Sequence, residues 1–148
     1  MTPAAADLSG ADGQAAQSPF QGNCPCLSGE QYAECCGRFH GGGAQAPTAE
    51  QLMRSRYSAF VLLDAGYLLR TWHPDTRPAE LALDPDMVWR RLDIGSTSRG
   101  GPLDTEGTVE FAAHFRHDGE RGTHHETSRF VRVDRRWYYV DAVNLEFG

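Results

Sequence analysis

The clearest hydrophobic pattern in the chain begins at Thr48, after which apolar residues recur at helical spacing. Thr48 and Gln51 form a T-x-x-Q capping box, which satisfies free N–H groups at the start of a helix. The sequence therefore predicts a helix from Thr48 to about Leu63. Arg54 and Ser58 lie away from its apolar face, which consists of Met53, Tyr57, Phe60 and Val61.

A second, shorter helix is predicted after Asp64, which can cap its first turn. Pro74 ends this helix, because the residue before a proline, here His73, is pushed out of the α region. The polar residues 75–86 give little signal and lead either to a short helix or directly into a strand near Trp89. The apolar side of the second helix comprises Leu68, Leu69 and Trp72.

Three strands are predicted in the second half of the chain. Residues 109–115 alternate between apolar and polar side chains, and Asp118-Gly119 starts the turn that follows. A second strand runs from about His124 to Val133 and a third from Arg136 to Val143, with Asp134-Arg135 as a tight hairpin turn. Helices followed by antiparallel strands predict an α+β fold, with the helices packed on one face of the sheet.

The hairpin turn also predicts a register between the last two strands. It places Phe130 opposite Tyr139 and Ser128 opposite Asp141. Side chains on a strand alternate between two faces, so Glu126 would join these four residues on one face of the sheet. Polar groups would then stand where a plain core has apolar ones.

Composition narrows the class of protein. The chain has 148 residues, the size of one domain with accessories, and no apolar run long enough to span a membrane. Residues 1–22 are rich in small and polar residues, which predicts a disordered tail, and they lack the features of a signal peptide. A cytoplasmic protein is therefore expected. The net charge of −6 disfavours broad binding to nucleic acid.

Several types of chemistry are absent from the sequence. All 14 basic residues are arginine, so no lysine can form a Schiff base. The chain has no G-x-S-x-G, no phosphate-binding glycine loop and no H-E-x-x-H. Whether the protein is an enzyme stays open on this evidence.

All four cysteines lie within residues 24–36, in the run C-P-C-L-S-G-E-Q-Y-A-E-C-C. Four thiolates suit the tetrahedral coordination of zinc, and the chain shows no sign of an oxidising compartment. Disulfides in cross-pairs such as Cys24–Cys35 are the alternative. His40 is a possible replacement ligand, although a loop residue is the simpler interpretation. The predicted zinc ligands are Cys24, Cys26, Cys35 and Cys36.

This cysteine run resembles the SEC-C motif, the zinc-binding knuckle C-x-C-x8-C-C/H found at the carboxyl end of the translocase ATPase SecA. The resemblance implies the same four cysteine ligands. Glycine usually follows the second cysteine of the motif, whereas this chain has Leu27. That departure affects the turn and removes no ligand.

A second resemblance, to the YchJ family, covers Cys24 to about Asp141. It implies a nuclear transport factor 2-like (NTF2-like) domain, a helical layer on a strongly curved sheet that forms a cone with a cavity. The family hairpin often has Asn-Gly where this chain has Asp134-Arg135. The motifs that carry the resemblance are Leu52–Tyr57, Thr71–Pro74, Ser128–Phe130 and Trp137–Asp141.

The expected organisation follows from these segments. A disordered tail covers residues 1–22, the SEC-C-like knuckle residues 23–40, a glycine-rich flexible linker residues 41–47, and the NTF2-like domain residues 48–148. The linker and the complete helix cap at Thr48 predict that residues 46–148 fold without the knuckle.

A polar pocket is predicted between the helices and the sheet. At least one arginine of the first helix is expected to face Glu126 or Asp141 across the cavity. These arginines either form structural ion pairs or clamp an anion, and His73 serves either as a structural hydrogen-bond partner or as a general base. The candidate residues are Arg54, Arg56, Tyr57, Trp72, His73, Glu126, Ser128, Tyr139 and Asp141.

Three functions are compatible with these features. The first is a zinc-binding protein-interaction module whose knuckle contacts a protein partner. The second is a cone domain that binds a small molecule or acts on it, which is an analogy with the fold alone. The third is a contact between the knuckle and the ribosome or nucleic acid, which the acidic charge disfavours.

Overall fold

The computed structural model describes residues 20–147, of which residues 144–147 are described by their backbone alone. Most of the predicted disordered tail, residues 1–22, lies outside the described part of the chain. Within residues 20–147, no helix is both long and apolar enough to cross a membrane.

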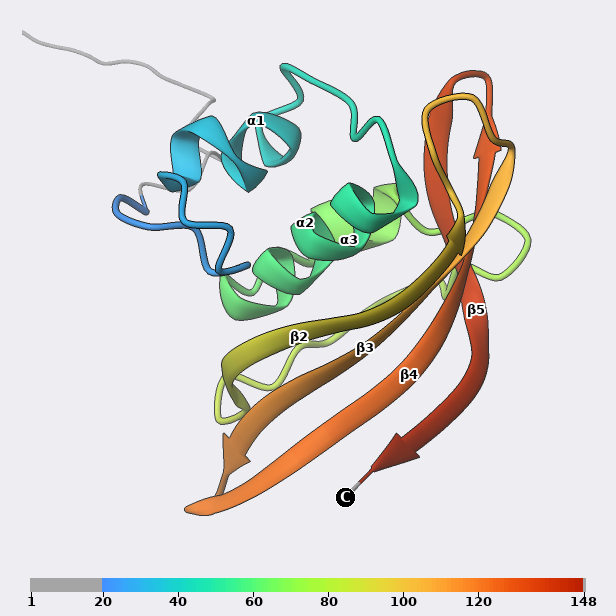
Figure 1. The fold of residues 1–148 in the computed structure, drawn as a ribbon. Coiled ribbons are helices and arrows are strands. Elements are labelled where there is room, and N and C mark those ends of the chain that lie inside the picture. The colour runs from blue at the N-terminus through green and yellow to red at the C-terminus, as the bar shows by residue number, and fades with distance from the viewer. Residues whose placement is uncertain (1–19, 148) are drawn as a thin grey trace, which may run out of the picture.

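A single antiparallel sheet forms one side of the molecule (Figure 1). Its strands follow one another in space as they do in sequence, in the order β2-β3-β4-β5. The sheet is strongly curved, and the helices α2 and α3 lie against its hollow side. The α+β class and the curved sheet are therefore as predicted. The strands are β2 Val88–Arg99, β3 Glu106–His117, β4 Glu120–Val133 and β5 Arg136–Phe147.

Two-residue turns close the last two hairpins, as the sequence predicts. Asp118 and Gly119 have φ values of 53° and 80°, and Asp134 and Arg135 have φ values of 51° and 70°. Positive φ at both central residues is the requirement of the type I′ turn, whose twist matches that of the strands it joins. Arg135 therefore occupies a position that glycine or asparagine adopts more easily.

The predicted register between β4 and β5 is right at the turn and wrong further along. Phe130 pairs with Tyr139, but the ladder shifts by one residue between Arg129 and Phe130, so Arg129 pairs with Asp141. An extra residue in one strand reverses which face the following side chains occupy. Asp141 therefore lies on the face of Arg129, away from Glu126.

The helix α2 (Ala49–Val61) begins at the predicted cap, where Thr48 Oγ1 accepts a hydrogen bond from Gln51 N at 3.1 Å. Its residues Leu52, Met53 and Tyr57 are buried in the main core. The helix therefore forms the layer that closes the hollow side of the sheet (Figure 1).

The helix α3 (Ala65–Arg70) is capped by Asp64, whose Oδ1 accepts from Tyr67 N at 3.0 Å. It ends before Trp72, which was predicted on its apolar side. Thr71–His73 instead runs beside β5, where Tyr139 N donates to Thr71 O and His73 N donates to Tyr139 O. This backbone pairing places the Trp72 side chain against the sheet.

The cysteine-rich segment packs on the side of α2 that faces away from the sheet (Figure 1). It contains the short helices η2 (Tyr32–Glu34) and α1 (Cys36–His40). Arg54 Nη1 donates to Cys26 O at 3.0 Å, and Ser58 Oγ lies 3.5 Å from Cys24 Sγ. Ser58 is fully buried. The face of α2 that looked solvent-exposed in the sequence is therefore covered by the knuckle.

The segment 41–47, predicted to be a flexible linker, is also held to the domain. Ala46 belongs to the main core, and Trp137 Nε1 donates to Pro47 O at 3.1 Å. Arg70 Nη2 donates to His40 O at 2.7 Å, which ties the end of α1 to α3. These contacts make the knuckle and the cone neighbours with a shared interface.

Candidate functional site

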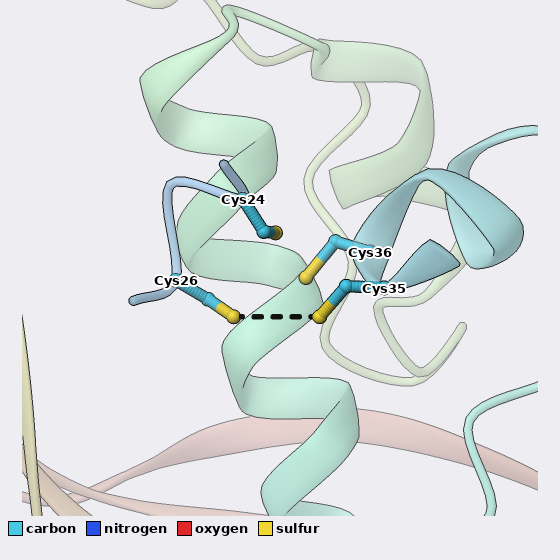
Figure 2. Close-up of side chains that lie close together, drawn as sticks. All are labelled: Cys24, Cys26, Cys35 and Cys36. Carbon is cyan, nitrogen blue, oxygen red and sulfur yellow. Dashed lines mark hydrogen bonds between the residues drawn. The ribbon is translucent and has the colours of Figure 1, made fainter. Parts of the chain in front are cut away.

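The four cysteines converge on one point beside α2. One ligand atom from each lies within 4.8 Å of the others (Figure 2). Cys24 and Cys26 come from a short hairpin that is closed by the bridge between Asn23 and Gln31. Cys35 and Cys36 come from the junction of η2 and α1.

The donor set suits a soft or borderline metal ion. The four side chains are free thiols, so the alternative of two disulfides is not what the structure contains. Hydrogen bonding with Cys24 raises the pKa of Cys26 to about 11, and the same kind of contact, together with burial, raises the pKa of Cys36. A bound cation would favour the thiolate form of all four. Four cysteine ligands without a free position are typical of structural zinc.

Leu27 occupies the turn between the two halves of the centre. Its φ of 66° is in the left-handed region, which explains why glycine usually stands there. Leu27 N donates to Cys24 O at 3.1 Å, so the turn closes as the motif requires. The leucine side chain points outward and is 55% exposed.

His40 is not a ligand of the centre, and it is not an ordinary loop residue either. Its Nε2 lies 2.8 Å from Ser55 O, a pure acceptor, so Nε2 carries the proton. Its Nδ1 must then accept the hydrogen bond from the Tyr32 hydroxyl at 2.6 Å. Burial lowers the pKa of His40, which favours this neutral form. Both ring nitrogens are therefore engaged: Nε2 fastens the knuckle to α2, and Nδ1 is held by Tyr32 within the knuckle.

A cavity of about 340 Å³ lies between α2 and the hollow side of the sheet. Most of its wall is apolar, with aromatic rings from α2, β2, β3 and β5. A smaller set of polar side chains also lines the cavity. The polar lining residues are Arg56, His124, Glu126, Ser128 and the hydroxyl-bearing Tyr57 and Tyr139.

Glu126 is the buried carboxylate of this cavity. Its Oε1 accepts from His124 Nε2 at 2.8 Å, and its Oε2 accepts from Ser128 Oγ at 2.5 Å and from Tyr139 OH at 3.0 Å. Burial alone would raise the pKa of Glu126, but these three hydrogen bonds outweigh it and lower the pKa. Glu126 is therefore ionised and held in a fixed orientation.

Arg56 is the buried cation on the opposite wall, 4% exposed. Its Nη1 donates to Leu68 O at 2.8 Å and to Thr71 Oγ1 at 2.7 Å. Its Cζ lies 4.6 Å from the centre of the Tyr139 ring and 5.3 Å from that of Trp72. The guanidinium is thus positioned by neutral acceptors and aromatic faces.

The structure brings together only part of the pocket predicted from the sequence. Arg56 and Glu126 line one cavity, together with Tyr57, Trp72, Ser128 and Tyr139.

The other candidate residues lie outside the cavity. Arg54 points to the knuckle, and its Nε donates to Glu50 at 3.0 Å. His73 Nδ1 accepts from Asp75 N outside the cavity. The bulge in β5 moves Asp141 to the other face, where it forms a two-pronged ion pair with Arg129 at 3.0 Å.

Sequence reasoning missed two features. Trp89 on β2, Phe111 on β3 and His124 on β4 also line the cavity, which only the pairing of these strands brings about. A separate hollow of about 400 Å³ at the end of β2, β3 and β4 is rich in arginine. The pairing of β2 with β3 creates this local basic patch, which an overall charge of −6 conceals. Its arginines are Arg90, Arg91, Arg116 and Arg121.

Comparisons with known proteins agree with this architecture. Residues 48–142 match the family described as YchJ, middle NTF2-like domain, and residues 23–38 match the SEC-C motif. The chain is 58% identical over 123 residues to UPF0225 protein SCO1677 of Streptomyces coelicolor, covering 83% of this chain and 96% of that protein. It is 53% identical over 122 residues to a UPF0225 protein of Bordetella pertussis, covering 80% and 90% of the two chains.

Two solved structures share the fold. The solution structure of RPA3114, a SEC-C motif containing protein from Rhodopseudomonas palustris, has a TM-score of 0.72 and 34% identity, covering 84% of this chain and all of that one. The crystal structure of a SEC-C motif containing protein from Psychrobacter arcticus has a TM-score of 0.64 and 30% identity, covering 80% of each chain. Both similarities extend over the knuckle and the cone together.

Proposed function

This chain belongs to the UPF0225 family of proteins with a YchJ-type NTF2-like domain, and from that premise we propose that it binds a small organic molecule in the cavity of the cone. The observation that carries the proposal is the cavity of about 340 Å³ that gathers buried Arg56 and Glu126 among aromatic rings. Small-molecule sites are typically concave and mostly apolar, with a few placed polar groups, and have volumes of about 300–1,000 Å³.

The knuckle serves this function structurally in our proposal. Zinc held by Cys24, Cys26, Cys35 and Cys36 would fix the knuckle, and it would supply folding energy without an open position for catalysis. The knuckle packs on one side of α2, and the same helix presents Arg56 to the cavity on its other side. The metal centre thereby supports one wall of the binding site.

Binding of small fragments tests the proposal through the tryptophan indoles. Trp72 and Trp89 line the cavity, whereas Trp137 Nε1 donates to Pro47 outside it. We expect some members of a library of neutral, acidic and basic fragments to shift the ¹H–¹⁵N indole signals of Trp72 and Trp89. The signal of Trp137 should stay in place.

Two neighbouring alanines on β3 provide matched variants. Ala113 lines the cavity and pairs with His124, and Ala112 lies on the opposite face of the sheet. Ala113→Phe should fill the cavity and abolish fragment binding, while Ala112→Phe should leave it intact. The proposal is wrong if no fragment binds, or if binding is the same in both variants.

A protein-interaction role of the knuckle is the second candidate. The observation that favours it is the exposed Leu27 at the outer turn of the metal centre. A photo-crosslinking side chain at position 27 should then capture a discrete partner in cells. The same group at Val133, which is 43% exposed on the β4–β5 hairpin, is the control. Identical adducts at both positions would remove this candidate.

A further inference from the structure

Arg56 carries a charge that the fold itself does not balance. Burial lowers the pKa of Arg56 to about 10, so the side chain is still charged at neutral pH. Its hydrogen bonds go to a backbone carbonyl and a hydroxyl, which are neutral. Within residues 20–143, no carboxylate lies within the 4.0 Å of an ion pair with Arg56. Burying a cation without a contacting anion costs free energy. The guanidinium of Arg56 therefore has room for an anionic partner in the cavity.

Glu126 influences Arg56 from a distance and does not fill this gap. Its field raises the pKa of Arg56, and the two charges line one cavity, Arg56 from α2 and Glu126 from β4. Its oxygens, however, already accept from His124, Ser128 and Tyr139. With its oxygens engaged by these three donors, Glu126 forms no ion pair with Arg56, and among the described side chains no other anion contacts the guanidinium.

A further donor near Arg56 also lacks an acceptor. Trp72 Nε1 is buried and has no hydrogen-bond partner, although the guanidinium of Arg56 lies over its ring at 5.3 Å. An unmade hydrogen bond of a buried donor costs about 1–3 kcal/mol. A ligand that satisfies this part of the cavity therefore needs a hydrogen-bond acceptor, and that acceptor should be negatively charged because it lies beside Arg56.

The rest of the cavity wall favours a ligand with an apolar group. The apolar part of the wall is formed by Met53, Phe60, Met87, Trp89 and Phe111. Methionine and aromatic side chains adapt to flat or branched apolar groups. A ligand that buried such a group here would displace water from apolar surface.

We propose that the cavity binds a small organic acid, whose carboxylate meets Arg56 and Trp72 Nε1 and whose aromatic or branched body fills the apolar end. This inference rests on the cavity function proposed above and adds the chemical class of the ligand. A guanidinium pairs with a carboxylate through charge-assisted hydrogen bonds, which are stronger than neutral ones.

A matched series of probes tests the ligand class on the intact wild-type chain. Naphthalene-1-acetate, its neutral amide and the cationic 1-(2-aminoethyl)naphthalene have the same apolar body and differ in the polar group. Isothermal titration calorimetry should give the acid an affinity at least about tenfold higher than that of the amide, the effect of one charged hydrogen bond. The acid should move the Trp72 indole signal furthest downfield, because its acceptor is anionic, whereas the amide carbonyl is a neutral acceptor and the amine offers none.

Two variants separate the hydrogen bond from simple packing. Trp72→Phe keeps an aromatic ring and removes the N–H, so the acid should lose the part of its preference over the amide that the indole supplies, while Arg56 retains the rest. Trp89→Phe removes similar bulk from the cavity wall without removing a partnerless buried donor, so the preference should remain even if both affinities fall. The measured quantity is the ratio of the acid and amide affinities, which a general loss of packing does not change.

The outcomes distinguish the ligand class from the cavity function. Equal or tighter binding of the amide or the amine would overturn the organic-acid inference and leave the cavity function standing. An acid preference that survives Trp72→Phe unchanged would also overturn the assigned contact. If none of the three probes binds while other fragments shift the indole signals of Trp72 and Trp89, the organic-acid inference fails and the cavity function stands. If no fragment binds either, both fail.

Discussion

A few side chains in this protein adopt states that only their surroundings explain. Leu27 takes a left-handed backbone conformation because the turn between Cys24 and Cys35 requires it, although its side chain has little to contact. Glu126 stays ionised in a largely apolar cavity because three donors surround it. Each state costs free energy at one residue and supports a larger site.

The conformation of Leu27 predicts that Leu27→Gly stabilises the knuckle. Left-handed backbone costs a residue with a Cβ about 1–2 kcal/mol, and glycine avoids that cost. Competition with a zinc chelator should show a gain of about 1 kcal/mol in the glycine variant. Leu27→Ala removes most of the exposed side chain but keeps the strain, so it should show little change. Equal gains in both variants would mean that the exposed side chain, and not the backbone, is responsible.

The environments of two carboxylates predict contrasting mutant stabilities. Glu126→Gln puts an amide among three hydrogen-bond donors and should lower the free energy of unfolding by about 1–3 kcal/mol. Asp141→Asn disrupts an exposed ion pair with Arg129 and should cost about 0–1 kcal/mol. Urea denaturation at neutral pH measures both. The assignment of Glu126 to the buried site is wrong if Asp141→Asn proves the more damaging.

The lowered pKa of Glu126 also predicts a pH dependence. A carboxyl group whose pKa is lower in the folded chain than in the unfolded chain stabilises the fold. This stabilisation is fully present above the unfolded pKa, about 4.3 for glutamate, and is lost as the pH falls through the folded pKa. The difference in stability between wild type and Glu126→Gln should therefore shrink below about pH 4.3. A difference that stays constant down to the acid transition would show that Glu126 is not ionised at neutral pH.

At the scale of elements, α2 connects the two sites. One face carries Arg54, Ser55 and Ser58 against the knuckle, and another carries Arg56 and Tyr57 to the cavity. A hydrophobic-pattern search finds only the apolar stripe of this helix. The knuckle covers the remaining face with polar contacts, which leave no periodic apolar signal in the sequence.

The packing of Ser58 predicts that enlarging this residue loosens the knuckle. Ser58 is fully buried and its Oγ lies 3.5 Å from Cys24 Sγ, so Ser58→Leu should overpack the interface at a cost of about 1–3 kcal/mol. The variant should release zinc to a chelator faster than wild type. Ser96→Leu, at an exposed position on β2, is the control. Unchanged release from Ser58→Leu would show that the knuckle does not depend on α2.

Local signals predicted the elements well and the long-range details less well. The caps at Thr48 and Asp64 and the turn at Asp134-Arg135 were identifiable because neighbouring residues determine them. The bulge that turns Asp141 away from Glu126 was not, because both registers satisfy the same alternation of side chains. The position of Trp72 depends on backbone pairing with Tyr139, which is distant in sequence.

At the scale of the whole molecule, the knuckle, the helices and the sheet form three layers (Figure 1). His40 joins the first two layers through Tyr32 and Ser55, and Arg70 joins them through His40 O. The boundary near residue 47 therefore separates segments of sequence that share an interface. We infer that the cone depends on the knuckle for part of its stability.

Truncation tests this dependence. A chain of residues 46–148 should fold but melt about 10 °C lower than the full chain, the shift expected for a loss of about 2 kcal/mol in a domain of this size. The loss arises because removal of the knuckle exposes polar groups of α2 and α3 that it buries, namely those of Ser55, Ser58 and Tyr67. Differential scanning calorimetry of both chains measures it. An unchanged melting temperature would support the independent domain that the glycine-rich linker first indicated.

The claim on which the architecture depends most is that the four-thiol centre holds a structural zinc ion. Native mass spectrometry of the intact chain, purified under reducing conditions, tests it directly, with Cys35→Ser as the matched variant. The account predicts one zinc ion per wild-type chain, four free thiols after denaturation, and a clear loss of zinc in Cys35→Ser. A folded wild-type chain that carries no zinc, or two disulfides in its place, would contradict it.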